Sequence, residues 1–346
     1  MSNLRPATLP KEKRGHGKET TVAGKLALEL LERFPSAPTR SLARILQRDN
    51  PEVFTTLNQA QLRIGYYRGK TGAKNRSIVS VVVAPPVVAP AFGLPVEITE
   101  AWPAYELPIK RGIGIVMSDV HVPYHLSTAL AALFRYAKAK PIKFIILDGD
   151  ISDCFALSRF QKDPRKVDFK NEIQSVTRFL DALEINFPSA KIIYKEGNHE
   201  RRLSQYLESR APELLDVAGG WIDFLKLKER GIEWVPEQRL IHAGYLTILH
   251  GDEFQRGQSL SVNPARTAFI RTKDCALVAH SHVGSEHTET TVRDRVITCW
   301  SIGCLCQLHP EWARLNKWST GFALLEMDGK NFAVQNKKIL PDGTVV

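Results

Sequence analysis

The chain has 346 residues, of which 43% are hydrophobic and 24% charged, as in an ordinary globular protein with room for more than one structural unit. No apolar run approaches the roughly 18–20 residues that cross a bilayer, and the polar N-terminus lacks the apolar core of a secretory signal, so we expect no membrane association. Five cysteines without a paired CxxC pattern favour free thiols in a reducing, cytoplasmic compartment.

The net charge of +10 is concentrated near the N-terminus. Residues 1–76 carry 15 Lys and Arg against 6 Asp and Glu, so nearly all of the basic excess lies there. A local excess of this kind is typical of a segment that binds a polyanion, although a solubilising tail would have the same composition.

The first part of the chain is expected to be helical. Residues 1–20 are polar and basic and are predicted to form a disordered tail. Residues 21–78 are predicted to form a small all-α domain, with helices over 22–34, after the turn at 35–39, and from about 55 to 64. Short helices joined by a tight turn resemble a helix-turn-helix module, but a plain docking domain would look similar.

The end of this basic domain interleaves cations, aromatic residues and glycines. Such a mixture suits contact with phosphates and stacking on bases. The residues expected to contact nucleic acid are Arg63, Tyr66, Tyr67, Arg68, Lys70, Lys74 and Arg76. An apolar, proline-rich stretch at 79–110 follows, and we expect it to be an extended linker or arm before a catalytic domain at 111–346.

From residue 112 onward the apolar runs predict alternating strands and helices. Strands are expected at 113–117, 144–147 and 191–195, helices at 127–140 and 171–186, and mostly helical structure over 200–230. The remainder is expected to be rich in strands, at 245–250, 275–279, 288–292, 296–300, 321–327 and 332–335. This order indicates an α/β fold with two packed sheets flanked by helices.

Polar clusters follow five of the predicted strands, at residues 118–121, 149–153, 197–200, 250–252 and 280–282. The carboxyl ends of strands are the places where open α/β folds carry their chemistry. The clusters contain carboxylates, an amide oxygen and imidazoles, which are ligands for divalent metal ions. A lone histidine is usually a core or surface residue, but five such clusters in one chain predict a metal site.

The chemistry expected of such a site is phosphoryl transfer. Two ions about 3.5–4 Å apart clamp a phosphate and lower the pKa of a bridging water, which gives a hydroxide that attacks phosphorus. The leaving group then needs a proton. His199 follows the amide Asn198 and is expected to face the leaving group as the general acid.

These clusters resemble the five sequence blocks of the calcineurin-like metallophosphoesterases. The blocks are Asp119-x-His121, Gly149-Asp150-x-x-Asp153, Gly197-Asn198-His199-Glu200, His250-Gly251 and His280-x-His282, over roughly residues 112–300. The resemblance implies a four-layer α/β/β/α sandwich around two metal ions, preceded here by the small all-α basic domain. It implies one ion on Asp119, His121, Asp150 and His282, a second on Asp150, Asn198, His250 and His280, and His199 as catalytic histidine. The family uses manganese, iron, zinc or sometimes magnesium, and we expect manganese first.

Departures from the family pattern bear on the substrate. The protein-phosphatase branch has Arg where this chain has Cys154, and the double-strand-repair nucleases have His at the position of Asp153. The usual Gly before the last His-x-His is Ala279 here. Arg201 and Arg202 would then supply phosphate contacts, or they are surface residues at the start of a helix.

Cysteines and tryptophans gather near the C-terminal end of the resemblance. Cys299, Cys304 and Cys306 with His309 would be one zinc hypothesis, but the spacing fits no structural zinc motif, so buried thiols are expected. The tryptophans Trp300, Trp312 and Trp318 either line one wall of the active-site cleft or pack against the sheets.

The sequence as a whole predicts a two-metal phosphoesterase that hydrolyses phosphodiester bonds in nucleic acid, which residues 1–76 would bind. One alternative is a phosphomonoesterase that acts on a phosphoprotein or a nucleotide. Another is a DNA-binding regulator whose phosphoesterase domain is a non-catalytic scaffold. The complete ligand set argues against the scaffold, which has no need to keep every ligand and the acid.

Overall fold

The computed structural model describes residues 21–34, 37–68, 102–160, 163, 165, 168–215, 217–236, 238–254 and 262–346. The chain divides into two compact units, residues 1–99 and 100–346. The expected tail at 1–20, most of the expected linker, and Lys70, Lys74 and Arg76 lie outside the described residues. Within the described ranges, no helix combines the length and the apolar character needed to cross a membrane.

The first unit contains the three predicted helices, α1 (Val22–Arg33), α2 (Thr39–Asp49) and α3 (Leu57–Tyr67). Thr56 and Gln59 form a capping box at the start of α3, which satisfies the free backbone N–H groups of its first turn. The helices pack around buried Leu31, Leu42 and Ile64. The connection from α2 to α3 covers residues 50–56, which is longer than the turn of a helix-turn-helix motif.

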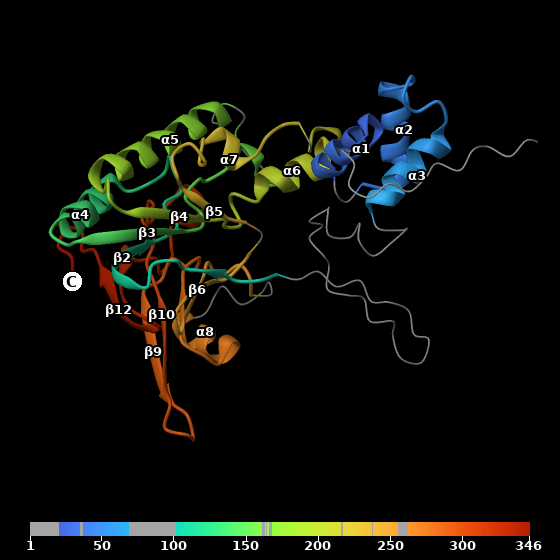
Figure 1. Cartoon of the computed structure of the whole chain (residues 1–346). Helices are drawn as coiled ribbons and strands as arrows, with labels where there is room; N and C mark the ends of the chain where they lie inside the picture. Colours follow the sequence, from blue (N-terminus) through green and yellow to red (C-terminus); the bar gives the residue numbers. More distant parts are fainter. Residues whose placement is uncertain are drawn as a thin grey trace, which may run out of the picture. The chain divides into compact units, whose positions relative to one another are not determined.

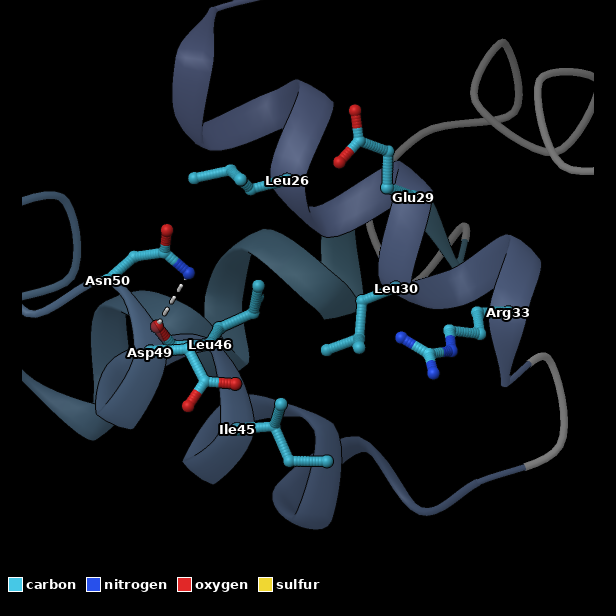
Figure 2. Close-up of a pocket in the computed structure, with 8 residues that line it drawn as sticks. All are labelled: Leu26, Glu29, Leu30, Arg33, Ile45, Leu46, Asp49 and Asn50. Atoms are coloured by element: carbon cyan, nitrogen blue, oxygen red, sulfur yellow. Dashed lines mark hydrogen bonds between the residues drawn. The ribbon is translucent and has the colours of Figure 1, made fainter.

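A shallow groove lies between α1 and α2 of this unit (Figure 2). Its floor is apolar, from Leu26, Leu30 and Ile45, and its polar lining consists of Glu29, Arg33, Asp49 and Asn50. The lining offers no imidazole or thiol for catalysis.

The first sheet of the second unit has six strands in the order β12-β11-β2-β3-β4-β5. Its parallel part consists of β2 (Arg111–Met117), β3 (Ile142–Asp148), β4 (Lys191–Lys195) and β5 (Glu233–Val235), and the antiparallel strands β11 (Gly321–Asp328) and β12 (Asn331–Lys338) complete the edge. Helices α4 (Ser127–Lys138) and α5 (Phe169–Asn186) cover its outer face (Figure 1). Their buried Leu133, Val176 and Leu180 pack against the strands.

The second sheet has the order β1-β6-β7-β8-β10-β9. Its strands are β1 (Tyr105–Glu106), β6 (Ile241–Ala243), β7 (Leu246–Leu249), β8 (Ala276–Val278), β9 (Ser285–Thr290) and β10 (Val296–Ser301). Phe144 and Ile146 from the first sheet pack against Ile248 and Leu277 from the second. Helix α8 (Pro264–Thr272) covers the outer face of the second sheet (Figure 1). The layers therefore run α/β/β/α, and the predicted fold class is confirmed.

The differences from the predicted elements are short segments. The strands β1, β5 and β6 have two or three residues, too few for a hydrophobic period, and none of them was predicted. Helix α8 was also missed, although Asn263 caps it and Pro264 occupies its first position. Residues 200–230 contain α6 (Arg202–Arg210), α7 (Trp221–Phe224) and turns, so this region is less helical than predicted.

Candidate metal centre

Parallel strands bring the first three clusters to one edge of the first sheet. Strands β2, β3 and β4 are adjacent and parallel, and Asp119, Asp150 and Asn198 follow their carboxyl ends. In the second sheet β7 and β8 are also parallel neighbours, followed by His250 and by the His280–His282 turn. Chain segments far apart in sequence therefore deliver their polar side chains to one place.

The backbone at these turns is unusual. Asp119, His121, Asp150, His280 and His282 all have left-handed conformations, with φ between 49° and 61°. Such a conformation costs a non-glycine residue of the order of 1–3 kcal/mol, and strained residues tend to cluster at functional sites. Five of the ten non-glycine residues with positive φ in the described part of the chain belong to the predicted ligand set, so the strain is concentrated there.

The predicted ligands form two groups in the structure. In the first, His282 Nε2 lies 3.0 Å from Asp119 Oδ1 and 3.3 Å from His121 Nε2. In the second, His250 Nε2 lies 3.3 Å from Asp150 Oδ2, and His280 completes a group whose ligand atoms all lie within 4.8 Å of one another. The structure thus brings together three of the four residues expected for each ion, and Asp150 remains the carboxylate expected to join the two groups.

Unpartnered buried atoms show that this set fits metal ions. Asn198 Oδ1, His250 Nε2 and His280 Nδ1 are buried and have no hydrogen-bond partner. Buried polar atoms without partners are rare because losing water costs them free energy. An amide oxygen, imidazole nitrogens and carboxylates are the donors that a divalent ion such as Mn²⁺, Fe²⁺ or Zn²⁺ accepts. The donors present therefore suit resident divalent ions.

Further contacts orient the ligands from behind. His250 Nδ1 donates to the carbonyl oxygen of Asp148 at 2.7 Å, which leaves Nε2 free to face the site. His121 Nδ1 lies 3.0 Å from Asp153 Oδ1, and this contact turns its Nε2 inward in the same way. Fixing one ring nitrogen in this way sets the tautomer of a metal-binding histidine. Asp153 is thus placed as a support for a ligand.

Glu200 has a role that the sequence did not reveal. Its buried carboxylate accepts hydrogen bonds from the backbone N–H groups of Asp150, Ile151, Ser152 and Gly197, and from the hydroxyl of Tyr194. This one side chain therefore joins the loop after β3 to the loop after β4. The residue was part of a recognised block, but spacing alone could not show which atoms it holds.

His199 lies beside the centre with both ring nitrogens engaged. Its Nδ1 donates to the carbonyl oxygen of Asp153 at 2.7 Å, and its Nε2 accepts from Arg202 Nη2 at 2.9 Å. Burial lowers the pKa of His199 despite the opposing charge of Asp150. The ring is therefore neutral, with its Nε2 lone pair directed at a guanidinium.

The two adjacent arginines have different positions. Arg201 pairs with buried Asp252 at 2.8 Å, which ties it into the supporting structure. Arg202 donates to both His199 and the carbonyl oxygen of Asp153. Of the two, Arg202 is the one that reaches the centre.

The buried pair of Asp119 and His282 holds a proton in the absence of metal. Burial opposes the charged form of His282, but the Asp119 carboxylate outweighs this and raises the pKa of His282 to about 10. The same contact lowers the pKa of Asp119 against the effect of burial. A metal ion needs neutral imidazole, so its binding would displace this proton.

The cysteines do not form the zinc site considered above. Cys299 belongs to the core under α8, and His309 is exposed, with its Nδ1 3.2 Å from the carbonyl oxygen of Arg314. Cys304 and Cys306 are buried thiols, as expected. Cys306 Sγ lies 3.8 Å from His282 Nδ1, on the side of the ring that faces away from Asp119.

Of the described residues expected to contact nucleic acid, two make internal contacts in the helical unit and two are at least partly exposed. Tyr67 is buried in the core of the helical unit, and Arg68 donates to Thr39 and to the carbonyl oxygen of Ala37. Internal packing accounts for these two residues. Tyr66 is 42% exposed, and Arg63 is partly exposed.

Known proteins resemble the second unit. A family model described as calcineurin-like phosphoesterase matches residues 115–298. The Gene 54 proteins of Mycobacterium phages L5 and D29 are 26% and 25% identical over 232 residues, which cover 63% of this chain and 89% of each relative. Similar solved structures include Vacuolar Protein Sorting 29 of Cryptosporidium parvum (14% identity, TM-score 0.37, 69% of this chain and 96% of that chain) and the Pseudomonas putida nuclease MPE (13%, 0.28, 64% and 86%). TM-scores this low support no conclusion about substrate.

The family model covers more than half of the chain and spans the strand ends that carry the ligands. The chain therefore belongs to the calcineurin-like phosphoesterase family and is a metal-dependent phosphoesterase.

Proposed function

We propose that this protein uses two divalent metal ions to hydrolyse phosphodiester bonds in nucleic acid. The observation that carries the proposal is the pair of ligand groups, one of Asp119, His121 and His282 and the other of Asp150, His250 and His280. The unpartnered amide oxygen of Asn198 is a further donor for the second ion. The ions would supply Lewis acidity at the phosphate and a water of lowered pKa. Manganese is the first ion to test, because oxygen and imidazole donors suit it.

Arg202 and His199 would bind and protonate the substrate. The fixed Nδ1–H of His199 makes Nε2 the atom that exchanges a proton with the leaving group. Arg202 lies against that atom, where its guanidinium can take a phosphate oxygen instead. A bound phosphate would draw Arg202 away from Nε2, and its negative charge would favour the protonated, acidic form of His199. Arg202 would thus replace the arginine that the protein-phosphatase branch carries at the position of Cys154.

The charge on α2 supports nucleic acid as the substrate. Arg40, Arg44 and Arg48 are exposed at four-residue intervals, so they form one stripe with a rise of about 6 Å between successive residues. Buried Leu42 and Leu46 occupy the opposite face of the helix. Arg48 is also paired with Asp49, but an exposed pair of this kind is weak and does not prevent phosphate contact. A row of arginines is suited to the backbone of a nucleic acid.

The salt dependence of DNA binding tests this stripe. Changing Arg40, Arg44 and Arg48 to Gln should reduce the slope of log K against log salt by about 2–3, since each phosphate contact contributes about 0.9 for duplex DNA. Changing Lys25 and Arg33 on α1 to Gln removes exposed charge from the same unit and is the control. An unchanged slope in the triple variant would exclude α2 as the nucleic-acid surface.

Activity on a small panel of substrates tests the reaction itself. With Mn²⁺, bis-p-nitrophenyl phosphate and DNA should be hydrolysed faster than p-nitrophenyl phosphate, and His199→Ala should lose most of the activity on DNA, whose leaving alkoxide needs a proton. His242→Ala, which alters a half-exposed histidine paired with Glu106, is the matched control. Turnover of the monoester alone would reassign the protein as a phosphomonoesterase. Absence of turnover with any divalent ion would support the scaffold alternative.

A further inference from the structure

A chain of aromatic rings leads from the metal centre to solvent. The ring of His282 packs on Trp318, with ring centroids 4.1 Å apart, and Trp318 packs edge-to-face on Trp312 at 5.4 Å. Trp312 is 78% exposed, which is uncommon for so large an apolar side chain. Trp300 by contrast is buried against Phe332. Trp318 therefore contacts the expected ligand His282, and Trp312 packs on Trp318 and presents its surface to solvent.

The loop that carries these rings is ordered by its own hydrogen bonds. The Asn316 amide donates to the carbonyl oxygens of Leu308 and Ala313, and its side-chain oxygen accepts from the backbone N–H of Trp318. The backbone N–H of Ser319 donates to the carbonyl oxygen of the ligand His282 at 2.8 Å. Hydrogen bonds therefore fix the conformation of the loop and attach it to the backbone of His282. An exposed ring held this firmly loses little conformational entropy when a ligand stacks on it.

The same loop carries exposed cations. Arg314 and Lys317 lie on either side of Asn316 and are both exposed, against a single acidic residue, Glu311. Aromatic rings interleaved with cations are the combination that binds single-stranded nucleic acid, because bases stack on the rings and phosphates contact the cations. In a duplex the bases are already stacked and are not available to such a ring.

We propose that Trp312, supported by Trp318, is a stacking platform for an unpaired base of a single-stranded nucleic acid whose neighbouring phosphodiester lies at the metal centre. The inference rests on the proposed phosphodiesterase function and adds a substrate class to it, single strands or frayed ends. The position of the platform favours a base over a protein partner. It lies two ring contacts from a metal ligand, where the nucleotide next to a bound phosphodiester would be placed.

Two oligonucleotides that differ only in their bases provide the test. Binding is measured with manganese-loaded, full-length His199→Ala protein, so that the strands stay intact, using a short oligothymidylate and an abasic strand of the same length. The phosphates are the same in both, so contacts of the N-terminal unit with the backbone cancel. The thymidylate should bind at least about ten-fold more tightly than the abasic strand, in line with stacking on one aromatic ring.

Adding Trp312→Ala should remove this difference, whereas Trp312→Phe should keep most of it. Tyr245→Ala is the matched control, because Tyr245 is also a large exposed aromatic residue, with 63% of its surface exposed. It contacts Lys330, which belongs to the turn between β11 and β12, at the end of the strands away from the metal centre. Because Trp312 is so exposed, its truncation should leave the fold intact.

The outcomes separate the platform from the reaction. If thymidylate and abasic strands bind equally, or if Trp312→Ala keeps the difference in affinity, the proposal that a base stacks on Trp312 is wrong, whether or not the protein hydrolyses diesters. The Mn²⁺ bound per chain of the otherwise wild-type Trp312→Ala protein reports on the metal centre alone, since no base takes part in it. The bound Mn²⁺ should equal that of wild type, and a large loss would mean that Trp312 supports the metal centre rather than the substrate.

Discussion

Replacing Glu200 by Gln tests whether one buried carboxylate holds the two ligand loops together. Glu200 is fully buried. Its Oε2 accepts from the backbone N–H groups of Asp150 and Gly197, and its Oε1 accepts from those of Ile151 and Ser152 and from the hydroxyl of Tyr194. The donors surround both oxygens, so an NH₂ group cannot replace either oxygen without facing donors.

The expected cost follows from counting the donors that lose a partner. If the amide nitrogen of Gln takes the place of Oε2, two backbone N–H groups remain unpaired, and the other orientation leaves three groups unpaired. A buried donor without a partner costs about 1–3 kcal/mol, so the variant should lose about 2–6 kcal/mol of unfolding free energy. That is a large part of the roughly 5–15 kcal/mol that stabilises a typical domain.

Denaturation followed by tryptophan fluorescence measures this loss selectively. All six tryptophans lie in the unit of residues 100–346, so the signal reports on the catalytic unit and not on the helices. Glu208→Gln on α6, an exposed position, is the control and should change stability by less than about 0.5 kcal/mol. A loss below about 1 kcal/mol in Glu200→Gln would show that the loops do not depend on this carboxylate.

Three further predictions concern the acid, a buried carboxyl and a thiol. His199→Ala should lower kcat by about 10²–10⁴-fold without loss of bound metal. The loss should be larger for a diester with an alkyl leaving group than for a diester that releases p-nitrophenolate, and kcat measured on the two diesters tests this. Burial raises the pKa of Glu172 to about 7 from an ordinary 4.5, so the native chain keeps a proton that the unfolded chain has lost. This group alone should lower the unfolding free energy by up to about 3 kcal/mol as pH rises between these values. Buried Glu200 is shifted in the same direction, so Glu172→Gln should reduce this slope in urea titrations across pH but not abolish it. Cys306→Ala should weaken Mn²⁺ binding by about 10–100-fold in calorimetry, because His282 Nδ1 loses its sulfur partner. Cys306→Ser and the remote Cys299→Ala should bind Mn²⁺ nearly as well as wild type. Equal Mn²⁺ binding by all three variants would contradict this role for Cys306.

The main architecture was predictable because long elements carry strong patterns. Strand β4 was predicted with the bounds that the structure has, and the three N-terminal helices differ from prediction only at their ends. Once neighbouring strands are parallel, their carboxyl ends must share an edge, so Asp119, Asp150 and Asn198 could be expected together from order alone.

Contacts that depend on side-chain direction could not be predicted in this way. Arg201 and Arg202 are adjacent in sequence, yet one pairs with Asp252 and the other contacts His199. Tyr66 and Tyr67 differ in the same manner, since one is exposed and the other is packed in the core. Neighbouring residues on a helix point about 100° apart, so a shift of one position decides between surface and core.

Metal titration of activity tests the central claim most directly. Metal-stripped protein is titrated with Mn²⁺ while bound metal per chain and turnover of bis-p-nitrophenyl phosphate are measured together. We predict that turnover is absent without metal and reaches its maximum as two ions bind per chain, and that Asp150→Asn, which alters the carboxylate that we propose both ions share, lowers metal binding and turnover together. Turnover that persists in a chelator, or that reaches its maximum with one ion bound, would contradict a two-metal phosphodiesterase.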